Sequence, residues 1–398
     1  MINKHKSKKW FAVLMALDAF FSIGPYLIWE SFMYYRIFDI FKMAIEIGAI
    51  SLFIYIKKRR IRVEYFYFAG SFIALYLFYV LDAYPGTLSI HVGTITKGLL
   101  ILIFLISDRD TKKEVFCFFS LIFAISIIPG IIFDFLSIIG VSIPGNFIES
   151  TQEIKVVAGQ HYKHYFGCVF RENIYYSPRF KQLCGMLDEP GALGTTAALL
   201  LCGEKFELYK KKHLMIVLVG GMLTMSLAFY LIIFIFIISH QIKDKKISKK
   251  KLAIMAFFCA LLIMLWNNSI FNEYIVRRLS FVKLVNNNRT SDEFDYIYRS
   301  FINDANSNIK LLFGNGNDNP VFHSVDASSY KVIIYNMGVF GFLFIITWFV
   351  YWGLKFSKKR SDPIILLVIF IISIYQRPWI MYLYSMVLLF GGIENSLS

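Results

Sequence analysis

Hydrophobic positions gather along the chain in long runs, and short polar segments rich in lysine and arginine separate them. A helix that crosses a bilayer needs roughly 20 mostly apolar residues, and several of these runs approach that length. The pattern predicts an all-α fold, a polytopic transmembrane helical bundle. The runs that fit one helix each lie at about 10–29, 37–56, 64–81, 90–106, 115–139, 190–202, 252–266 and 329–353.

Two further runs, 214–239 and 363–393, fit helical hairpins better than single spans. Basic clusters flank both ends of 214–239, and a single span would place one of them outside, against the positive-inside rule. A turn near 224–226 keeps both clusters on one side, and Gln376-Arg377-Pro378 supplies the corresponding turn in 363–393. The complete prediction is about 12 spans with both termini in the cytoplasm.

Composition and charge strengthen the membrane assignment. Hydrophobic residues make up 57% of the chain and charged residues only 17%, whereas soluble domains carry about 25% charged residues. The formal net charge of +15 would suit a nucleic-acid partner, but more than half of the 42 lysines and arginines lie in short clusters between apolar runs. That distribution is typical of cytoplasmic loops and argues against a basic groove for nucleic acid.

The sequence contains no P-loop, no HExxH or GxSxG motif and no cysteine–histidine set spaced for a metal. It therefore predicts neither ATP hydrolysis nor a bound metal or other cofactor. Of the five cysteines, Cys168 and Cys184 fall in one predicted outer loop, where they either pair or remain two separate thiols.

Two long segments, 140–188 and 267–328, fall on the outer side in this topology. Both are rich in Tyr, Phe and Arg, which argues against disorder, and long ordered loops are usually functional. The second segment contains an amphipathic helix at about 291–303, with Thr290 and Glu293 as its capping box. Its apolar face, which we expect to lie along the membrane surface, consists of Phe294, Ile297, Tyr298, Phe301 and Ile302.

Some charged residues fall inside predicted spans, where each costs about 3 kcal/mol unless it is paired. Asp39, Lys42 and Glu46 share one face of the 37–56 helix and predict an ion pair, with a proton or ion path as the alternative. The other charged residues of this kind stand alone in the sequence and are Asp18, Asp82, Lys97 and Asp134.

Arginines in the two outer loops are the candidate anion-binding residues. Arg171 and Arg179 precede a predicted helix and can clamp a phosphate, or bind lipid headgroups or solvent instead. Arg289 stands directly before the amphipathic helix, whose N-terminal N–H groups also favour an anion. Arg299 lies within that helix, and Asp295 four residues earlier offers it a purely structural partner.

Three residues are candidates for acid–base chemistry, namely Glu189, His323 and Asp326. Glu189, like its neighbour Asp188, can instead cap the helix that begins at Pro190. Asp326 can likewise cap the predicted helix that follows it. The sequence thus leaves a structural and a chemical role open for each carboxylate.

Three segments carry a resemblance to a known family. They are Leu187-Asp-Glu-Pro-Gly-Ala-Leu-Gly194, Leu312-Phe-Gly-Asn-Gly316, and Ser329-Tyr330 with Tyr335-Asn-Met-Gly-Val-Phe-Gly341. In these segments, and in the order of its spans and loops, the chain resembles bacterial O-antigen and capsular-polysaccharide polymerases of the Wzy type. The wider resemblance includes the lipopolysaccharide O-antigen ligases.

The resemblance implies a metal-independent glycosyltransferase of the bacterial inner membrane. Its donor would be a growing glycan on undecaprenyl diphosphate, its acceptor one lipid-linked repeat unit, and its candidate partners a chain-length regulator and a flippase. The chain departs from many relatives at Gln182 and Leu227, where they carry Arg. The family's functional residues are arginines of the outer loops, and those that match by loop position are Arg171, Arg179, Arg289 and Arg299.

Two alternative functions fit parts of the same pattern. An O-antigen-ligase-like transferase would use the same donor with a different acceptor. A transporter of lipid-linked sugar would need a continuous polar path through several spans and no large outer loops. The few charges inside the predicted spans and the two large loops favour the enzyme.

Overall fold

The computed structural model shows a mainly helical protein that divides into two compact units. Unit 1 is formed by Met1–Ile23, Arg36–Phe119 and Asn288–Ser398, and unit 2 by Gly24–Tyr35 and Ser120–Asn287. The described residues are 4–56, 63–83, 88–141, 143–148, 160–165, 167–173, 181–244, 292–303, 308–315, 329–375, 377 and 380–397. The predicted span 252–266 lies outside them.

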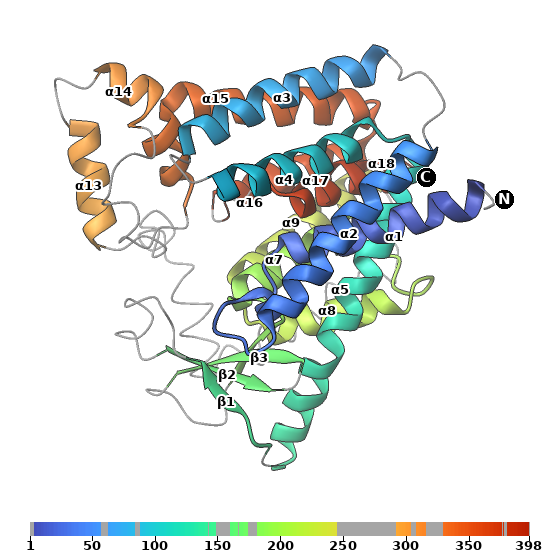
Figure 1. Cartoon of the computed structure of the whole chain (residues 1–398). Helices are drawn as coiled ribbons and strands as arrows, with labels where there is room; N and C mark the ends of the chain where they lie inside the picture. The colour runs from blue at the N-terminus through green and yellow to red at the C-terminus, as the bar shows by residue number, and fades with distance from the viewer. Residues whose placement is uncertain are drawn as a thin grey trace. The chain divides into compact units, whose positions relative to one another are not determined.

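Unit 1 consists of helices that lie where the apolar runs predict them (Figure 1). Its N-terminal helices are α1 (Lys4–Ser22), α2 (Tyr35–Ile56), α3 (Val63–Ala83), α4 (Leu88–Ile106) and the first part of α5 (Arg109–Ile138). Its C-terminal elements are α13 (Asp292–Asn303), α14 (Asn308–Phe313), α15 (Tyr330–Ser357), α16 (Ser361–Ile374), α17 (Leu383–Met386), the π-helix Val387–Gly391 and α18 (Gly392–Ser396).

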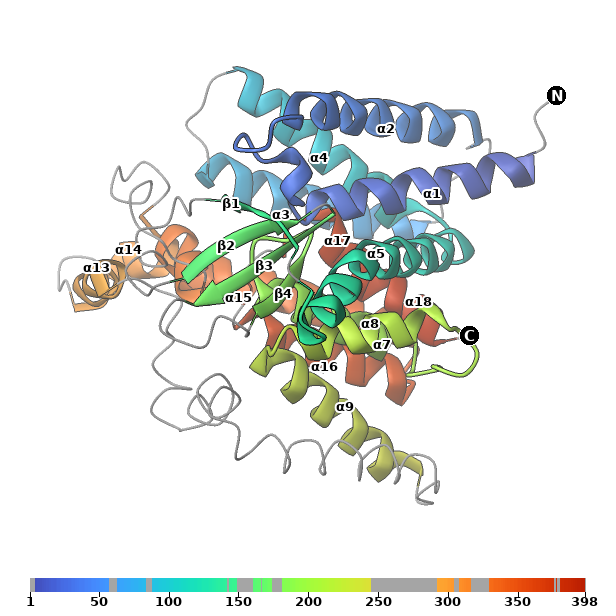
Figure 2. The same cartoon turned by 90° about the horizontal axis from the view of Figure 1, so that it is seen from below.

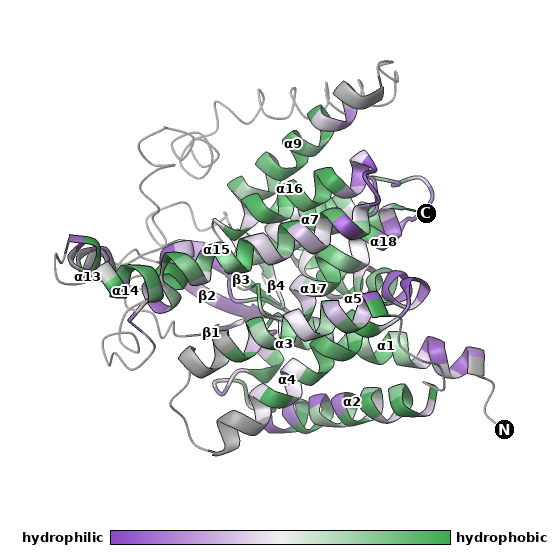
Figure 3. Cartoon of the chain, turned by 90° about the horizontal axis from the view of Figure 1, so that it is seen from above, coloured by the Kyte–Doolittle hydropathy of each residue, from purple (hydrophilic) through white to green (hydrophobic). Residues whose placement is uncertain are grey.

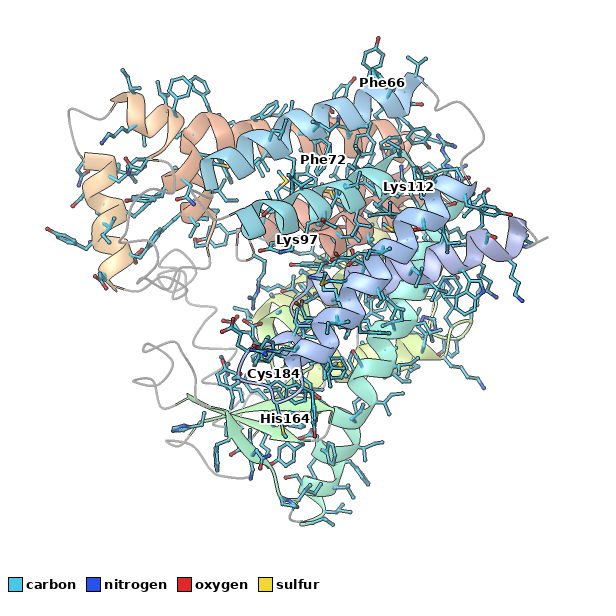
Figure 4. The ribbon with its side chains drawn as sticks, in the orientation of Figure 1. Phe66, Phe72, Lys97, Lys112, His164 and Cys184 are labelled. Atoms are coloured by element: carbon cyan, nitrogen blue, oxygen red, sulfur yellow. The ribbon has the colours of Figure 1, made fainter. Side chains whose placement is uncertain are left out.

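Helix α3 shows how these helices differ from those of a soluble bundle. One face is buried, with Phe68 at 0% and Phe72 at 1% exposure, while Phe66 and Tyr67 on the opposite face are 67% and 65% exposed. Figure 4 shows Phe66 pointing away from the helices and Phe72 pointing toward them. A helix that is hydrophobic all round is typical of a membrane or of a deeply buried core.

Among the described residues, two helices, α5 and α15, are long and apolar enough to cross a membrane. Figure 3 shows hydrophobic residues along most of the length of helices such as α7, α9 and α16. The arrangement of about 12 spans stays a prediction. Shorter apolar helices are Val63–Leu77, Gly93–Ile106, Pro190–Gly203, His213–Leu223, Leu227–His240 and Ser361–Ile374.

The charged residues inside unit 1 group together. Lys42 and Glu46 form the predicted ion pair, with Nζ and Oε1 3.8 Å apart. Asp18 on α1 lies within electrostatic range of both, and so does Lys97 on α4. The sequence-based view of Asp18 and Lys97 as isolated charges is therefore wrong, because three helices bring opposite charges within electrostatic range of one another.

The predicted outer loop 140–188 contains a four-stranded antiparallel sheet in the order β1-β2-β3-β4 (Figure 2). The prediction of an all-α fold is therefore wrong for this segment. β-branched and aromatic residues favour strands, and Gly167, with a φ of 81°, allows the reversal between the second and third strands. The strands are β1 (Asn146–Ile148), β2 (Gln160–Tyr165), β3 (Cys168–Asn173) and β4 (Lys181–Gly185).

Cys168 and Cys184 lie on neighbouring strands of this sheet as separate, buried thiols. Of the two alternatives that the sequence leaves open, two separate thiols are the one confirmed. Burial raises the pKa of the Cys168 thiol to about 12, so the thiol stays protonated and unreactive at neutral pH.

The remaining elements of unit 2 are helices and one short turn of 3-10 helix, η1 (Tyr26–Ile28). Helix α7 (Pro190–Gly203) follows β4, and α8 (His213–Leu223) and α9 (Leu227–Asp244) form the hairpin after it. The predicted helix break at 224–226 is confirmed. α7 packs closely on this turn, because a Cβ atom at Gly194 would lie 2.6 Å from the Cβ atom of Ser226.

Candidate functional site

Three residues on adjacent strands form a row on one face of the unit 2 sheet. Tyr162 on β2 lies opposite Arg171 on β3, and Arg171 lies opposite Gln182 on β4. Side chains directly opposite each other in antiparallel strands project from the same face and touch. Tyr162 and Gln182 are buried at 4% and 2% exposure, and Arg171 is half-buried between them.

Hydrogen bonds hold this row to the α8–α9 turn. The Nε of Arg171 donates to Oε1 of Gln182 at 2.9 Å, and Nη2 of Arg171 donates to the same oxygen. The amide Nε2 of Gln182 then donates to the carbonyl oxygen of Thr224 at 3.3 Å. The predicted anion-binding residue Arg171 is therefore fixed to β4 and, through it, to the hairpin turn.

The chain passes directly from β4 to the N-terminus of α7, where Glu189 is the N-cap residue and Pro190 the first residue of the helix. The side chain of Glu189 makes no capping hydrogen bond, so the interpretation of this carboxylate as a helix cap is wrong. Its backbone carbonyl accepts the first helical bonds instead, from the N–H groups of Ala192 and Leu193.

Charges from both segments act on the Tyr162 hydroxyl. Burial raises the pKa of Tyr162 above its ordinary range, and the charge of Arg171 opposes this effect. The carboxylates of Asp188 and Glu189 add to the rise. Two residues predicted to be functional, Arg171 and Glu189, therefore lie within charge range of one hydroxyl group that stays protonated at neutral pH.

An aromatic segment covers the same face of the sheet. Tyr26 belongs to one buried cluster with Tyr162 and Cys184, and its backbone N–H donates to the carbonyl oxygen of Met186 at 2.7 Å. Its ring lies 4.6 Å from the ring of His164, next to Cys184 in Figure 4. This segment was predicted to be the end of a first span, and the pattern of apolar residues does not reveal its contact with the sheet.

The opposite face of the sheet serves packing. Lys181 lies 3.2 Å from the carboxylate of Glu172 and donates to the Tyr165 hydroxyl at 2.6 Å. Burial lowers the pKa of Lys181, but the bonds to Tyr165 and Glu172 outweigh it and raise the pKa overall. Leu183 on this face packs against Gly130 of α5. Lys181 therefore has a structural role within the sheet.

The second candidate region lies in unit 1, where α13 and α14 pack beside the N-terminal end of α15 (Figures 1 and 2). α13 occupies the position of the predicted amphipathic helix, and its Phe294 and Phe301 pack on Tyr335. Arg299 is exposed on this helix. Asp295 accepts from Nζ of Lys331 at 2.8 Å, a structural partner other than the Arg299 that the sequence offers it.

Two glycines join α14 to α15 by their backbones. Gly338 interrupts α15 with a φ of 69°, and Gly314 after α14 has a φ of 88°. A Cβ atom on Gly338 would overlap the carbonyl group of Leu312, and one on Gly314 would overlap the carbonyl group of Asn336. Two of the three segments that carry the family resemblance are therefore packed against each other within unit 1.

The remaining predicted site residues, Arg179, Arg289, His323 and Asp326, lie outside the described residues. The N-cap of α15 is Ser329, whose side chain accepts from the N–H of Lys331, so Asp326 is not needed as its cap. Within the described part of the chain, three or more His, Cys, Asp or Glu side chains do not group as metal ligands.

Sequence analysis singled out Gln182 only as a departure from the family, and it did not place Gln182 or Tyr162 beside Arg171. Gln182 has a signal in the sequence, because it is a lone amide between Lys181 and the apolar Leu183, and a buried amide needs hydrogen-bond partners. The β2–β3 hairpin also has a signal in the sequence, because two runs that contain Tyr, Val and Phe lie on either side of Gly167.

The structure thus defines a mainly helical protein with, among its described residues, two helices able to cross a membrane. It also contains a small sheet in which Arg171 lies opposite the buried Tyr162. Comparisons of the chain with known protein families, with curated proteins and with solved structures find no match.

Proposed function

We propose that this protein is a membrane glycosyltransferase, a polymerase that joins undecaprenyl-diphosphate-linked oligosaccharide repeat units into a surface polysaccharide. One observation carries the proposal, namely that Arg171, which lies opposite Tyr162 in the sheet, and Glu189, at the start of α7, both act by their charge on the buried Tyr162 hydroxyl. The segment that forms this junction, 187–194, is one of those that resemble the polymerase family.

The chemistry suits these groups. In glycosyl transfer, the bond between the sugar C1 and the diphosphate oxygen breaks, and the acceptor hydroxyl oxygen bonds to C1. The diphosphate leaves with the electron pair, and the Arg171 guanidinium stabilises its developing charge. The Glu189 carboxylate takes the proton of the acceptor hydroxyl. His323 and Asp326 are further candidates for this base.

The proposal includes a multi-pass location in the bacterial inner membrane, which would suit a lipid-linked donor. Many large apolar side chains are exposed on helices, among them Ile37, Ile40, Ile47 and Ile54 of α2. Exposed apolar surface on this scale is typical of contact with lipid. The basic clusters between the apolar runs favour cytoplasmic termini and outer positions for 140–188 and 267–328.

The test measures the chain length of the polysaccharide made by a strain whose protein carries Arg171→Ala or Glu189→Gln. We expect glycans stalled at one repeat unit, with a normal amount of the protein in the membrane. Arg179→Ala and Arg289→Ala, made in the same strain, examine the arginines outside the described residues.

Two outcomes would contradict the proposal in different ways. Wild-type chain length in all of the arginine variants would refute the site. Long glycans left unattached on their carrier lipid in a deletion strain would refute polymerisation and favour a ligase.

Metal independence is examined with purified protein. Polymerisation should continue in EDTA, because charge on the leaving group is stabilised by guanidinium groups. Activity that is lost in EDTA and restored only by Mn²⁺ or Mg²⁺ would require a different mechanism.

A further inference from the structure

A buried carboxamide on β4 has no role in the chemistry described above. Gln182 is 2% exposed, and the backbone pairing of β3 and β4 places it directly opposite Arg171. Burial of a glutamine is costly unless both ends of its amide are hydrogen-bonded. Both ends are satisfied here, one by Arg171 and the other by Thr224.

The identity of these two partners fixes the orientation of the amide. The carbonyl oxygen of Thr224 only accepts hydrogen bonds, so it requires the NH₂ end of Gln182. The guanidinium of Arg171 only donates, so it requires the oxygen. A flipped amide would place donor against donor and acceptor against acceptor. The Arg171 guanidinium is therefore held in one orientation by a side chain that cannot turn.

The chemical type of the acceptor matters as much as its place. A neutral carboxamide accepts hydrogen bonds from Arg171 without cancelling its positive charge, whereas a carboxylate would form a salt bridge and compete with an anionic ligand. Gln182 therefore orients the Arg171 guanidinium without neutralising it.

We propose that Gln182 is a positioning residue, which orients the Arg171 guanidinium toward a diphosphate group and leaves its charge intact. This proposal rests on the proposed function, since it assigns the support for one of its anion-binding residues. It also links the anion site to the α8–α9 turn, because the same amide is bonded to Thr224.

The experiment measures binding of farnesyl diphosphate to the full chain in lipid nanodiscs by calorimetry. Gln182→Met preserves length and burial but removes the amide, and we expect it to weaken binding about tenfold, the effect of one lost charge-assisted hydrogen bond. Gln182→Glu preserves the acceptor but cancels the charge, and we expect a loss of about a hundredfold at neutral pH. Glu172→Gln, next to Arg171 but on the other face, is the matched control and should bind like wild type.

A pH series separates positioning from damage to the fold. The deficit of Gln182→Glu relative to wild type should shrink as the pH falls, because protonation of the new carboxyl removes its charge. If Gln182→Met does not fold, the pH dependence of binding by Gln182→Glu is the measurement that tests the proposal. A deficit that does not change with pH would overturn the positioning role.

The binding data also distinguish the two proposals. Wild-type affinity in Gln182→Met, together with weakened binding in Arg171→Ala, would overturn the positioning role and leave the anion site intact. Wild-type affinity in Arg171→Ala would overturn the anion site itself, and the role of Gln182 with it.

Discussion

The two candidate regions hold their charged groups in different ways. In unit 2, Arg171 lies on β3, and its guanidinium donates two hydrogen bonds to the side-chain oxygen of Gln182 on the neighbouring strand. In unit 1, Arg299 is exposed on α13, and that helix is held by an aromatic cluster and by the Asp295–Lys331 ion pair. Only the first arrangement orients a guanidinium before any ligand arrives.

The difference shows where each region is vulnerable. Adjacent strands bring side chains opposite each other, so polar side chains can support one another in the sheet. The α14–α15 contact is made instead by backbone at Gly314 and Gly338, where a side chain has no room. Polar substitutions should therefore damage the first region, and glycine substitutions the second.

The largest effect is expected from Gly338→Ala. An alanine there must adopt a positive φ and also displace the carbonyl group of Leu312, which together cost about 3 kcal/mol or more. The measurement is thermal stability of the purified protein in detergent. Gly70→Ala is the control, because nothing lies within 4 Å of its Cβ position, and its effect should stay within about 1 kcal/mol. Equal stability of the two variants would show that the kink in α15 is not required.

The next effect concerns activity and compares the two arginines. Arg171→Ala removes an oriented donor and should lower the polymerisation rate about a hundredfold, or by about 3 kcal/mol. Arg299→Ala removes an exposed side chain and should lower it less than about tenfold. Rates are measured with purified protein and a lipid-linked repeat unit. A larger loss of rate in Arg299→Ala than in Arg171→Ala would show that unit 1, and not unit 2, holds the more important arginine.

A smaller effect is expected from the ion pair that joins α13 to α15. Lys331 and Asp295 are 18% and 29% exposed, so solvent screens them and their coupling should be about 0.5–1 kcal/mol. A double-mutant cycle with Asp295→Asn and Lys331→Gln, read by thermal unfolding, measures it. The matched cycle of Asp295→Asn with Arg299→Gln should give no coupling. Coupling in the second cycle alone would restore the pair that the sequence predicts.

The smallest effect is a pH dependence in unit 2. His164 packs against Tyr26 and Phe32, and its Nε2 atom is buried with no hydrogen-bond partner among the described residues. Desolvation lowers the pKa of His164 below its ordinary value of 6.5, so the unfolded chain binds its proton more readily. The contribution of neutral His164 to the free energy of unfolding is therefore complete above pH 6.5 and declines as the pH falls below 6.5.

Melting temperatures between about pH 7.5 and pH 5.5 measure this dependence. His164→Phe retains the aromatic packing but cannot titrate, so it should melt with a weaker pH dependence than the wild-type protein. Identical profiles for the two proteins would show that other groups control the acid response of unit 2.

Much of the helical architecture was predictable from local pattern. Apolar runs identify helices such as α3 and α4, and flanking basic clusters identify the break between α8 and α9. The ion pair of Lys42 with Glu46 also follows from helical spacing within one element. These features depend on residues close together in the sequence, for which periodicity is sufficient.

The site was predictable only in part. Arg171 and Glu189 stand out in the sequence as a charged residue in an outer loop and an acid at a helix start. Their common electrostatic environment at Tyr162 depends on the register of β2, β3 and β4. Strands of mixed polar and aromatic residues, with both faces partly covered, show no clear alternation, so this register has no strong sequence signal.

The sequence alone determined that the chain is built mainly of apolar helices, because the period and length of hydrophobic runs are local properties. It also determined which polar residues are available for chemistry. Only the tertiary structure decided which of them meet. The bond of Arg171 to Gln182 and the contact of Gly314 with Asn336 each join separate elements of the chain, and their geometry follows from how strands and helices pack.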